Sequence, residues 1–301
     1  MCTNTMSAQA MIQPGTSIET DSNPTVGNLI HSIGDSGLCS DTPILECHLL
    51  LSNCLNRSKS WLLAHDDYHL TNEEAQEYAS LLSRRIAGEP IAYILGSQGF
   101  WDMELVVTPD TLIPRPETEL LVETVLAIHD AEFHRVIDLG TGSGAIAIAI
   151  QRERPDWEVF ATDYSSAALT VAVKNANEWS KGKINFLKSD WLKAFGSCAF
   201  DLIVSNPPYI REQDSHLPAL HHEPQSALTA PDAGMADLNT IIEQSTRCLK
   251  PGGQILLEHG YHQQKDVAAY LHENGYTDIE LFDDYNNTPR AVMARWVPGD
   301  C

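Results

Sequence analysis

The segment Val136-Ile137-Asp138-Leu139-Gly140-Thr141-Gly142-Ser143-Gly144 decides the fold. Its apolar first half is typical of a buried strand, and its second half is a turn with glycine at alternate positions. The residues that follow, 145–152, predict a helix. A strand that passes through such a turn into a helix is typical of nucleotide-binding α/β proteins. The turn alone does not identify the ligand, because it also suits an NAD-binding protein.

Polar residues stand at the ends of the next three predicted strands. The strands over 159–161, 184–187 and 201–204 lead, in this order, to Asp163, Asp190 and Asn206. Helices alternate with the strands, and further strands are predicted over 254–257, 279–282 and 291–297. This alternation predicts an α/β fold with a doubly wound parallel sheet, in which ligands bind where the strands end. The glycine turn and the three polar residues all fall at such ends, so we expect one shared site.

Two of these positions have alternative interpretations. Asp163 stands about 20 residues beyond the glycines, where an acid can bind the hydroxyl groups of a ribose. It can equally cap a helix, because a helix is predicted to begin near Ser165. Trp191, which follows Asp190, suits an adenine ring, and the alternative is an indole in the protein core.

The tetrapeptide Asn206-Pro207-Pro208-Tyr209 indicates the chemistry of the site. Neither proline has a backbone N–H group, so the chain must leave the sheet here in a stiff, extended conformation. The amide oxygen of Asn206 and a nearby backbone carbonyl are then two fixed acceptors, and Tyr209 offers a flat ring. Two acceptors and an aromatic ring suit a planar –NH2 group. The alternative is an ordinary turn at the end of a strand.

The chain divides by composition into four segments. Residues 1–24 lack periodicity and predict a disordered tail. Residues 25–89 predict a small helical domain that docks the substrate, residues 90–130 a β-hairpin with a linker helix, and residues 131–298 the catalytic domain.

Within the helical domain, Asp41-Thr42-Pro43 predicts a helix start with a capping side chain before a first-turn proline, and residues 71–74 match a capping box. The apolar positions of the first of these helices recur at helical spacing and include Ile44, Leu45, Leu49, Leu51 and Leu55.

Arg115 lies between two prolines at the start of the predicted linker helix. The restricted backbone aims its guanidinium, which could clamp a carboxylate of a substrate with two hydrogen bonds. The alternative is a plain helix start, in which the neighbouring acids interact favourably with the helix dipole.

Composition and charge exclude several classes of function and cellular location. The formal net charge is -22, from 41 acidic and 19 basic residues, which argues against binding of duplex DNA or RNA and favours a basic protein surface or a small substrate. The sequence has no run of 18 or more apolar residues, so no membrane span is expected. No Lys or Arg precedes Arg57, which argues against a secretory or transit peptide. The seven scattered cysteines, without a CxxC pair, predict reduced thiols in a cytoplasmic protein and no metal site.

Six motifs occur along the chain in this order: LIPRPETE, DLGTGSGAIAIAI, SDW, VSNPPYI, GMADL and LLEHG. Together they resemble the peptide-chain release-factor glutamine methyltransferases, the PrmC or HemK family, over roughly residues 30–297. The segment 211–224 departs from the family pattern, because it is shorter and lacks the usual Val-Arg pair.

The resemblance implies a class I methyltransferase fold, with S-adenosylmethionine as cofactor and class I release factors as protein partners. It implies that the cofactor contacts Asp138, which meets the methionine ammonium group, and also Gly140, Thr141, Gly142, Ser143, Gly144, Asp163, Asp190, Trp191 and Asn206. It further implies that the substrate glutamine, from the Gly-Gly-Gln loop of the factor, is held by Asn206, Pro207, Pro208 and Tyr209, with Arg115 nearby.

The predicted reaction is methylation of the glutamine side-chain nitrogen. The same tetrapeptide would serve an enzyme that methylates an amino group of a flipped nucleic-acid base. The acidic charge and the lack of a basic recognition domain weigh against that alternative. A protein that binds the cofactor without catalysis is a third interpretation, and the intact Asn206 motif weighs against it.

Overall fold

The computed structural model describes residues 24–128 and 134–298, and the chain forms two compact units that divide after Gly88. The predicted tail at 1–24 lies outside the described residues, apart from Pro24. The described part of the predicted hairpin and linker helix, residues 90–128, belongs to the same unit as the sheet. No helix in the described part of the chain is long and apolar enough to cross a membrane.

The first unit is helical. It contains α1 (Val26–Ser32), a short 3-10 helix η1 (Ile33–Asp35), α2 (Pro43–Leu55), α3 (Lys59–Ala64) and α4 (Asn72–Ile86). The predicted capping box at the start of α4 is confirmed: the Thr71 hydroxyl accepts from the Glu74 amide, and the Glu74 carboxylate accepts from the Thr71 amide. The predicted side-chain cap of α2 is wrong, because Thr42 makes no capping hydrogen bond.

The predicted apolar face of α2 is also wrong in part. Ile44, Leu45 and Leu49 are exposed, whereas Leu51 of the same pattern is fully buried, as are Cys47 and Leu50. The buried face also carries the Glu46 carboxylate, which accepts hydrogen bonds from Arg85 of α4 at 2.8 and 3.1 Å and from the hydroxyl of Ser40. A charged residue therefore shares the buried face of α2 with apolar side chains.

The second unit is an α/β domain that begins with α5 (Ile91–Leu95). The predicted hairpin is confirmed as the antiparallel pair β1 (Ser97–Phe100) and β2 (Met103–Val106). A 3-10 turn η2 (Pro116–Thr118) then leads into α6 (Glu119–Leu126). Beyond it come β3 (Arg135–Leu139), α7 (Ala145–Glu153), β4 (Glu158–Asp163), α8 (Ser166–Trp179), β5 (Asn185–Lys188), β6 (Phe200–Ser205), α9 (Ala236–Cys248), β9 (Leu249–Glu258), α10 (Gln264–Glu273), β10 (Tyr276–Asp283) and β11 (Pro289–Trp296).

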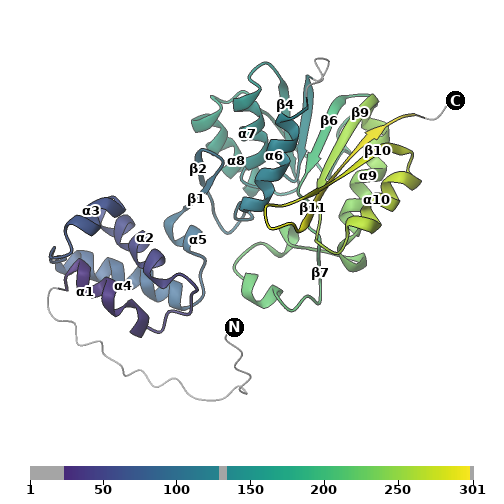
Figure 1. Cartoon of the computed structure of the whole chain (residues 1–301). Helices are drawn as coiled ribbons and strands as arrows, with labels where there is room; N and C mark the ends of the chain where they lie inside the picture. The colour runs from purple at the N-terminus through teal and green to yellow at the C-terminus, as the bar shows by residue number, and fades with distance from the viewer. Residues whose placement is uncertain (1–23, 129–133, 299–301) are drawn as a thin grey trace. The chain divides into compact units, whose positions relative to one another are not determined.

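These strands form one seven-stranded sheet in the order β10-β11-β9-β6-β3-β4-β5. The five strands β3, β4, β5, β6 and β9 are parallel, as predicted, whereas β11 runs antiparallel to both of its neighbours, β9 and the edge strand β10. Helices α6, α7 and α8 cover one face of the sheet, and α9 and α10 cover the other (Figure 1). Alternate residues along each central strand therefore enter different cores: Val136 packs in the first and Ile137 in the second.

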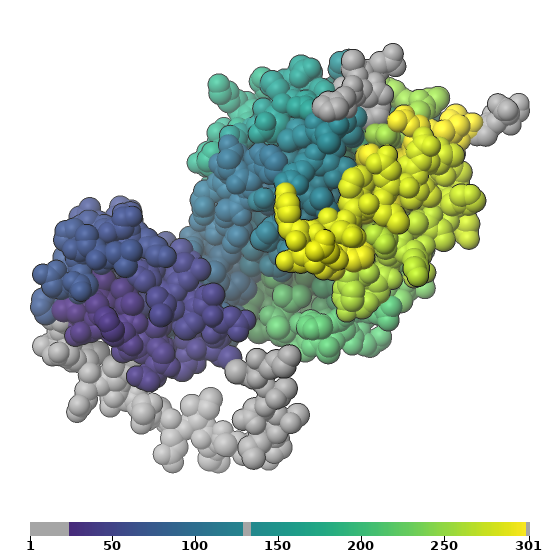
Figure 2. Space-filling model, in the orientation of Figure 1, coloured from purple at the N-terminus to yellow at the C-terminus, as the bar shows by residue number. Residues whose placement is uncertain are grey.

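The excursion between β6 and α9 contains β7 (Ile210–Arg211) and β8 (Thr229–Ala230), which pair in parallel, and three short 3-10 turns, η3 (Leu217–Leu220), η4 (Gln225–Ala227) and η5 (Asp232–Gly234). At the β10 edge of the sheet, the β10–β11 hairpin lies against α6, as the yellow and blue-green atoms in Figure 2 show. There the hydroxyl of Tyr285 donates to Glu123 of α6.

Candidate active site

The glycine-rich turn between β3 and α7 is fixed by backbone hydrogen bonds within the turn and to β4. The Thr141 amide donates to the Thr162 carbonyl at 2.8 Å, which ties the turn to β4. Gly140 has a φ of +69°, and a Cβ atom there would lie 3.3 Å from the ring of Trp191. A residue without a side chain therefore allows the Trp191 ring to lie against the turn.

Asp138 lies behind this turn. Its carboxylate is 1% exposed and accepts from the Thr141 hydroxyl at 2.6 Å and from the Ala147 amide at 3.3 Å. Burial raises the pKa of Asp138 to about 7, although both hydrogen bonds oppose the shift. Asp138 therefore braces the turn from behind, and its side chain does not line the adjoining cavity.

Asp163 ends β4 and faces the cavity. One carboxylate oxygen accepts from the Gly142 amide at 2.9 Å and the other from the Ser165 amide at 2.8 Å. Burial raises the pKa of Asp163, and these backbone donors oppose the shift. The helix cap that the sequence offered as an alternative belongs to Ser165, whose hydroxyl accepts from the Ala168 amide. Each Asp163 oxygen keeps further acceptor capacity toward the cavity.

A cavity of about 500 Å³ opens at the carboxyl ends of the parallel strands. The sequence-predicted residues that line it are Gly140, Gly142, Asp163, Asp190, Trp191, Asn206 and Pro208. A smaller cavity of about 110 Å³ shares Asn206 with it and is lined also by Arg115, Pro207 and Tyr209. Of the predicted residues, Thr141, Ser143 and Gly144 line neither cavity; they form the turn and the start of α7.

Trp191 and Asp190 form one wall of the larger cavity. Trp191 has a φ of +48°. Burial raises the pKa of Asp237, and a hydrogen bond from Trp191 opposes that rise. Asp237, in the first turn of α9, lines the same cavity. Asp190 is paired with Lys193 at 2.6 Å on the surface side. The indole therefore lines the cavity and also packs against the core, so Trp191 fits both interpretations in part.

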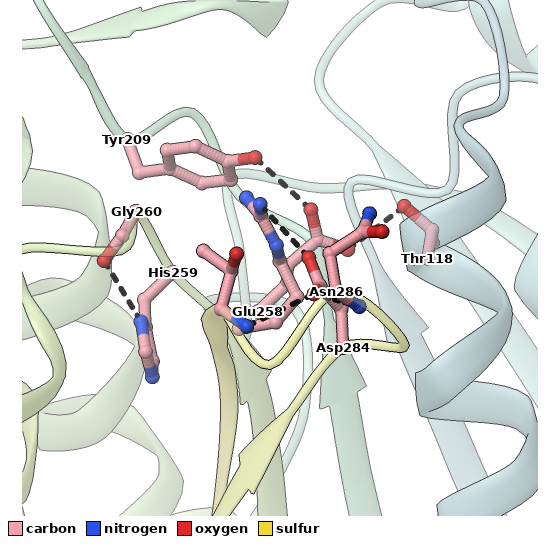
Figure 3. A network of polar contacts seen from close by, with 9 residues as sticks. Thr118, Tyr209, Glu258, His259, Gly260, Asp284 and Asn286 are labelled. Atoms are coloured by element: carbon pink, nitrogen blue, oxygen red, sulfur yellow. Dashed lines mark hydrogen bonds and ion pairs between the residues drawn. The ribbon is translucent and has the colours of Figure 1, made fainter.

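A chain of hydrogen bonds fixes the Asn206 motif, and Figure 3 labels three of the residues that form it, Thr118, Tyr209 and Glu258. The Asn206 side-chain nitrogen donates to the Thr118 hydroxyl at 3.0 Å, and Thr118 donates to the Glu258 carboxylate at 2.8 Å. The Tyr209 hydroxyl donates to the other oxygen of Glu258 at 3.0 Å. One carboxylate at the end of β9 therefore anchors both the amide and the ring of the motif.

Glu258 is 1% exposed, and burial raises its pKa to about 7. The positive charge of Arg290 acts in the opposite direction, and Arg290 is itself paired with Asp284 at 3.3 Å. Burial and the neighbouring Glu258 charge also raise the pKa of Tyr209, so its phenol stays protonated near neutral pH. The phenol is thus a donor to the carboxylate and not a base.

Arg115 meets a carboxylate of the chain itself. Its guanidinium pairs with Glu223, which is buried and also accepts from the Ile113 amide at 3.1 Å. The pair fastens the segment between β7 and β8 to the residues before α6. Arg115 also borders the smaller cavity, so its guanidinium forms a clamp within the protein, while the clamp on a substrate carboxylate stays a prediction.

Sequence reasoning missed three partners of the site: Thr118, Glu223 and Glu258. Thr118 and Glu258 stand inside the quoted motifs LIPRPETE and LLEHG, so a signal existed, but nothing in either motif names their partners. Among the described residues, no cluster of three or more His, Cys, Asp or Glu side chains could hold a metal ion.

Comparisons with known proteins agree with this geometry. The family model for the methyltransferase small domain matches residues 116–273, and the model for the PrmC N-terminal domain matches residues 34–96. The release factor glutamine methyltransferase of Salmonella typhimurium is 44% identical over 261 residues, which cover 86% of this chain and 94% of that protein. The chain belongs to the release factor glutamine methyltransferase family. The Escherichia coli relative is likewise 44% identical, over 85% of this chain and 94% of its own length.

A solved methyltransferase from Pyrococcus furiosus has the same fold, with a TM-score of 0.52 at 16% identity, and covers 73% of this chain and 100% of its own. Membership of the release factor glutamine methyltransferase family makes the chain an S-adenosylmethionine-dependent methyltransferase with a Rossmann-like sheet, as predicted.

Proposed function

We propose that the protein transfers a methyl group from S-adenosylmethionine to the side-chain nitrogen of the glutamine in the Gly-Gly-Gln motif of class I release factors. The observation that carries this proposal is the orientation of Asn206. Its nitrogen is turned toward Thr118 at 3.0 Å, so its oxygen is left as the acceptor at the junction of the two cavities.

The larger cavity suits S-adenosylmethionine. It combines the carboxylate of Asp163 for ribose hydroxyl groups, the indole of Trp191 for the adenine, and the bare backbone of Gly140 and Gly142. When bound, the cofactor supplies a methyl group activated by the adjacent sulfonium. Asp190 is proposed to lie near the adenine amino group, and Asp138 to brace the turn from behind.

The smaller cavity is proposed to receive the glutamine side chain. The Asn206 oxygen and the Pro207 carbonyl accept its two N–H groups, and the Tyr209 ring lies against its plane, with Pro208 keeping the backbone stiff. These acceptors favour electron density on an amide nitrogen that is otherwise conjugated with its carbonyl. Fixing the nitrogen in line with the methyl group can account for about 7–11 kcal/mol of the barrier.

Tandem mass spectrometry tests the substrate. We expect incubation of the protein with a class I release factor and S-adenosylmethionine to add the mass of one methyl group to the Gly-Gly-Gln glutamine. DNA and RNA, offered as acceptors instead of the factor, should gain nothing, because an acidic protein has few cations with which to hold a phosphate backbone. Methylation of another residue, or only of nucleic acid, would overturn the proposal. A substrate that works in translation also places the protein in the cytoplasm, which is part of the proposal.

Asp163→Ala is expected to weaken S-adenosylmethionine binding by about 1.5–3 kcal/mol, because it removes charge-assisted acceptors for the ribose. The Gly142 amide would lose its partner as well. Isothermal titration calorimetry measures the affinity, and Asp156→Ala is the control, since Asp156 is an exposed acid near the other end of the same strand. Unchanged affinity in a folded Asp163→Ala protein would remove Asp163 from the site.

We further propose that the helical unit, residues 25–88, docks the body of the release factor. Removal of residues 1–88 is then expected to raise KM for the intact factor by about tenfold or more, equivalent to about 1.4 kcal/mol of binding. Methylation of a short Gly-Gly-Gln peptide should be unaffected by the truncation, and this peptide assay is the control for folding of the remaining unit. An unchanged KM for the intact factor would show that the helical unit does not dock it.

A further inference from the structure

The donors and acceptors around Thr118 can be counted. Thr118 has one hydroxyl proton, and the buried carboxylate of Glu258, when ionised, can only accept. The proton is therefore committed to Glu258, so the Thr118 oxygen is left as an acceptor toward Asn206. The Asn206 atom that faces it at 3.0 Å must then be the nitrogen. The amide oxygen consequently points the other way.

We propose that Thr118 and Glu258 are positioning residues that set the direction of the Asn206 amide, so that an acceptor and not a donor meets the substrate nitrogen. This inference rests on the proposed function and deepens it. An amide can present either its oxygen or its NH2 group after a half-turn, and only the oxygen can accept from a substrate N–H. Because Thr118 donates its proton to Glu258, its oxygen can only accept from Asn206, and this fixes the direction of the amide.

The surroundings support this role. Thr118 is 5% exposed and ends η2, so its hydroxyl is held by backbone and packing. Glu258 receives the Tyr209 hydroxyl on its second oxygen, which prevents it from turning away from Thr118. His259, the next residue, contacts the Gly260 carbonyl and points away from Glu258 (Figure 3). Within residues 24–128 and 134–298, no second side chain is hydrogen-bonded to the Asn206 amide, so the Thr118 hydroxyl alone sets its direction there.

Two substitutions at one position separate direction from packing. Thr118→Val keeps the shape and removes the hydroxyl, whereas Thr118→Ser keeps the hydroxyl and removes a methyl group. We expect Thr118→Val to lower kcat on the order of tenfold to 100-fold, with little change in KM for the factor or in S-adenosylmethionine affinity. Thr118→Ser should stay close to the wild type. Thr124→Val is the matched control, because Thr124 is a similarly buried threonine of α6 whose hydroxyl bonds to Leu120.

The pH profile is a second readout. The charged and titratable groups that act on Glu258 are Glu117 of η2, Tyr209 and Arg290 of β11. With the pKa of Glu258 raised to about 7, the carboxyl gains a proton as the pH falls through that value and no longer requires the Thr118 proton. Activity should therefore be full above about 7 and fall below it. Asp138 has a similar pKa, so only the difference between the wild-type and Thr118→Val profiles reports on Glu258.

The outcomes are distinguishable. A wild-type protein that fails to methylate the factor overturns the proposed function, whatever the variants do. Given an active wild type, two results together support the positioning role. Thr118→Val lowers kcat and no longer shows the part of the fall in activity below about pH 7 that is due to Glu258, whereas Thr118→Ser keeps the wild-type kcat and pH profile. It is overturned if Thr118→Val retains the wild-type kcat. It is equally overturned if Thr118→Ser loses as much as Thr118→Val, because packing and not the hydroxyl would then be responsible.

Discussion

Replacement of Asn206 with alanine is expected to lower kcat for methylation of the release factor by on the order of 10²–10³, the range seen when one preorganised polar group is removed from an active site. The Asn206 oxygen is proposed to accept from the substrate amide most strongly in the transition state. Loss of such an interaction lowers kcat much more than it raises KM. Single-turnover kinetics with saturating factor and S-adenosylmethionine measures the effect directly.

The control for this substitution is Asn274→Ala. Asn274 caps the end of α10, where its side chain donates to the Tyr270 carbonyl and touches neither cavity. Calorimetry on Asn206→Ala checks that S-adenosylmethionine still binds, since Asn206 also lines the larger cavity. Full activity in a folded Asn206→Ala protein would show that the proposed mechanism is wrong, even if the substrate is right.

The layout of the sheet was predictable because its signals are local. The glycine turn and the buried strands over 136–139 and 201–204 follow from hydrophobic runs and turn residues. The antiparallel β10 and β11 were not anticipated, although only the short segment 284–288 separates them. A parallel connection needs a longer crossover, so this signal was present in the sequence. The exposed face of α2 was mispredicted because Glu46 is buried against Arg85, a partner far along the chain.

The residues of the candidate site likewise fall into those that the sequence predicts and those that it does not. Asp163, Asp190 and Asn206 could be assigned because parallel strands end at one edge of a sheet, so their positions follow from the strand pattern. Thr118 and Glu258 could not be assigned, because their contact joins residues 140 positions apart and Asn206 reaches Thr118 across 88 positions. Arg115 shows the same limit: its restricted backbone was recognised, but the carboxylate that it binds lies on a distant segment of the chain.

Gly234 occupies a position where no larger residue fits. Its φ is +88°, and a Cβ atom there would lie 2.1 Å from the carbonyl oxygen of Tyr209 and 2.8 Å from the side-chain nitrogen of Gln263. That Gln263 nitrogen donates to the same Tyr209 carbonyl at 3.1 Å. The backbone of Tyr209 is thus packed directly against Gly234 and held by Gln263. A side chain at position 234 must displace the end of the Asn206-Pro207-Pro208-Tyr209 motif.

Gly234→Ala is therefore expected to lower kcat by on the order of 10²-fold, because displacement of a positioning group by about 1 Å can cost that much. Binding of S-adenosylmethionine should change little, since Gly234 does not line the larger cavity. The control is Gly252→Ala, at a glycine with a φ of +81° and no atom within 4 Å of the added Cβ, which isolates backbone strain from the clash with Tyr209. Thermal unfolding of both variants measures that strain, and single-turnover rates measure the displacement. If Gly234→Ala loses no more activity than Gly252→Ala, the position of Tyr209 does not control methyl transfer.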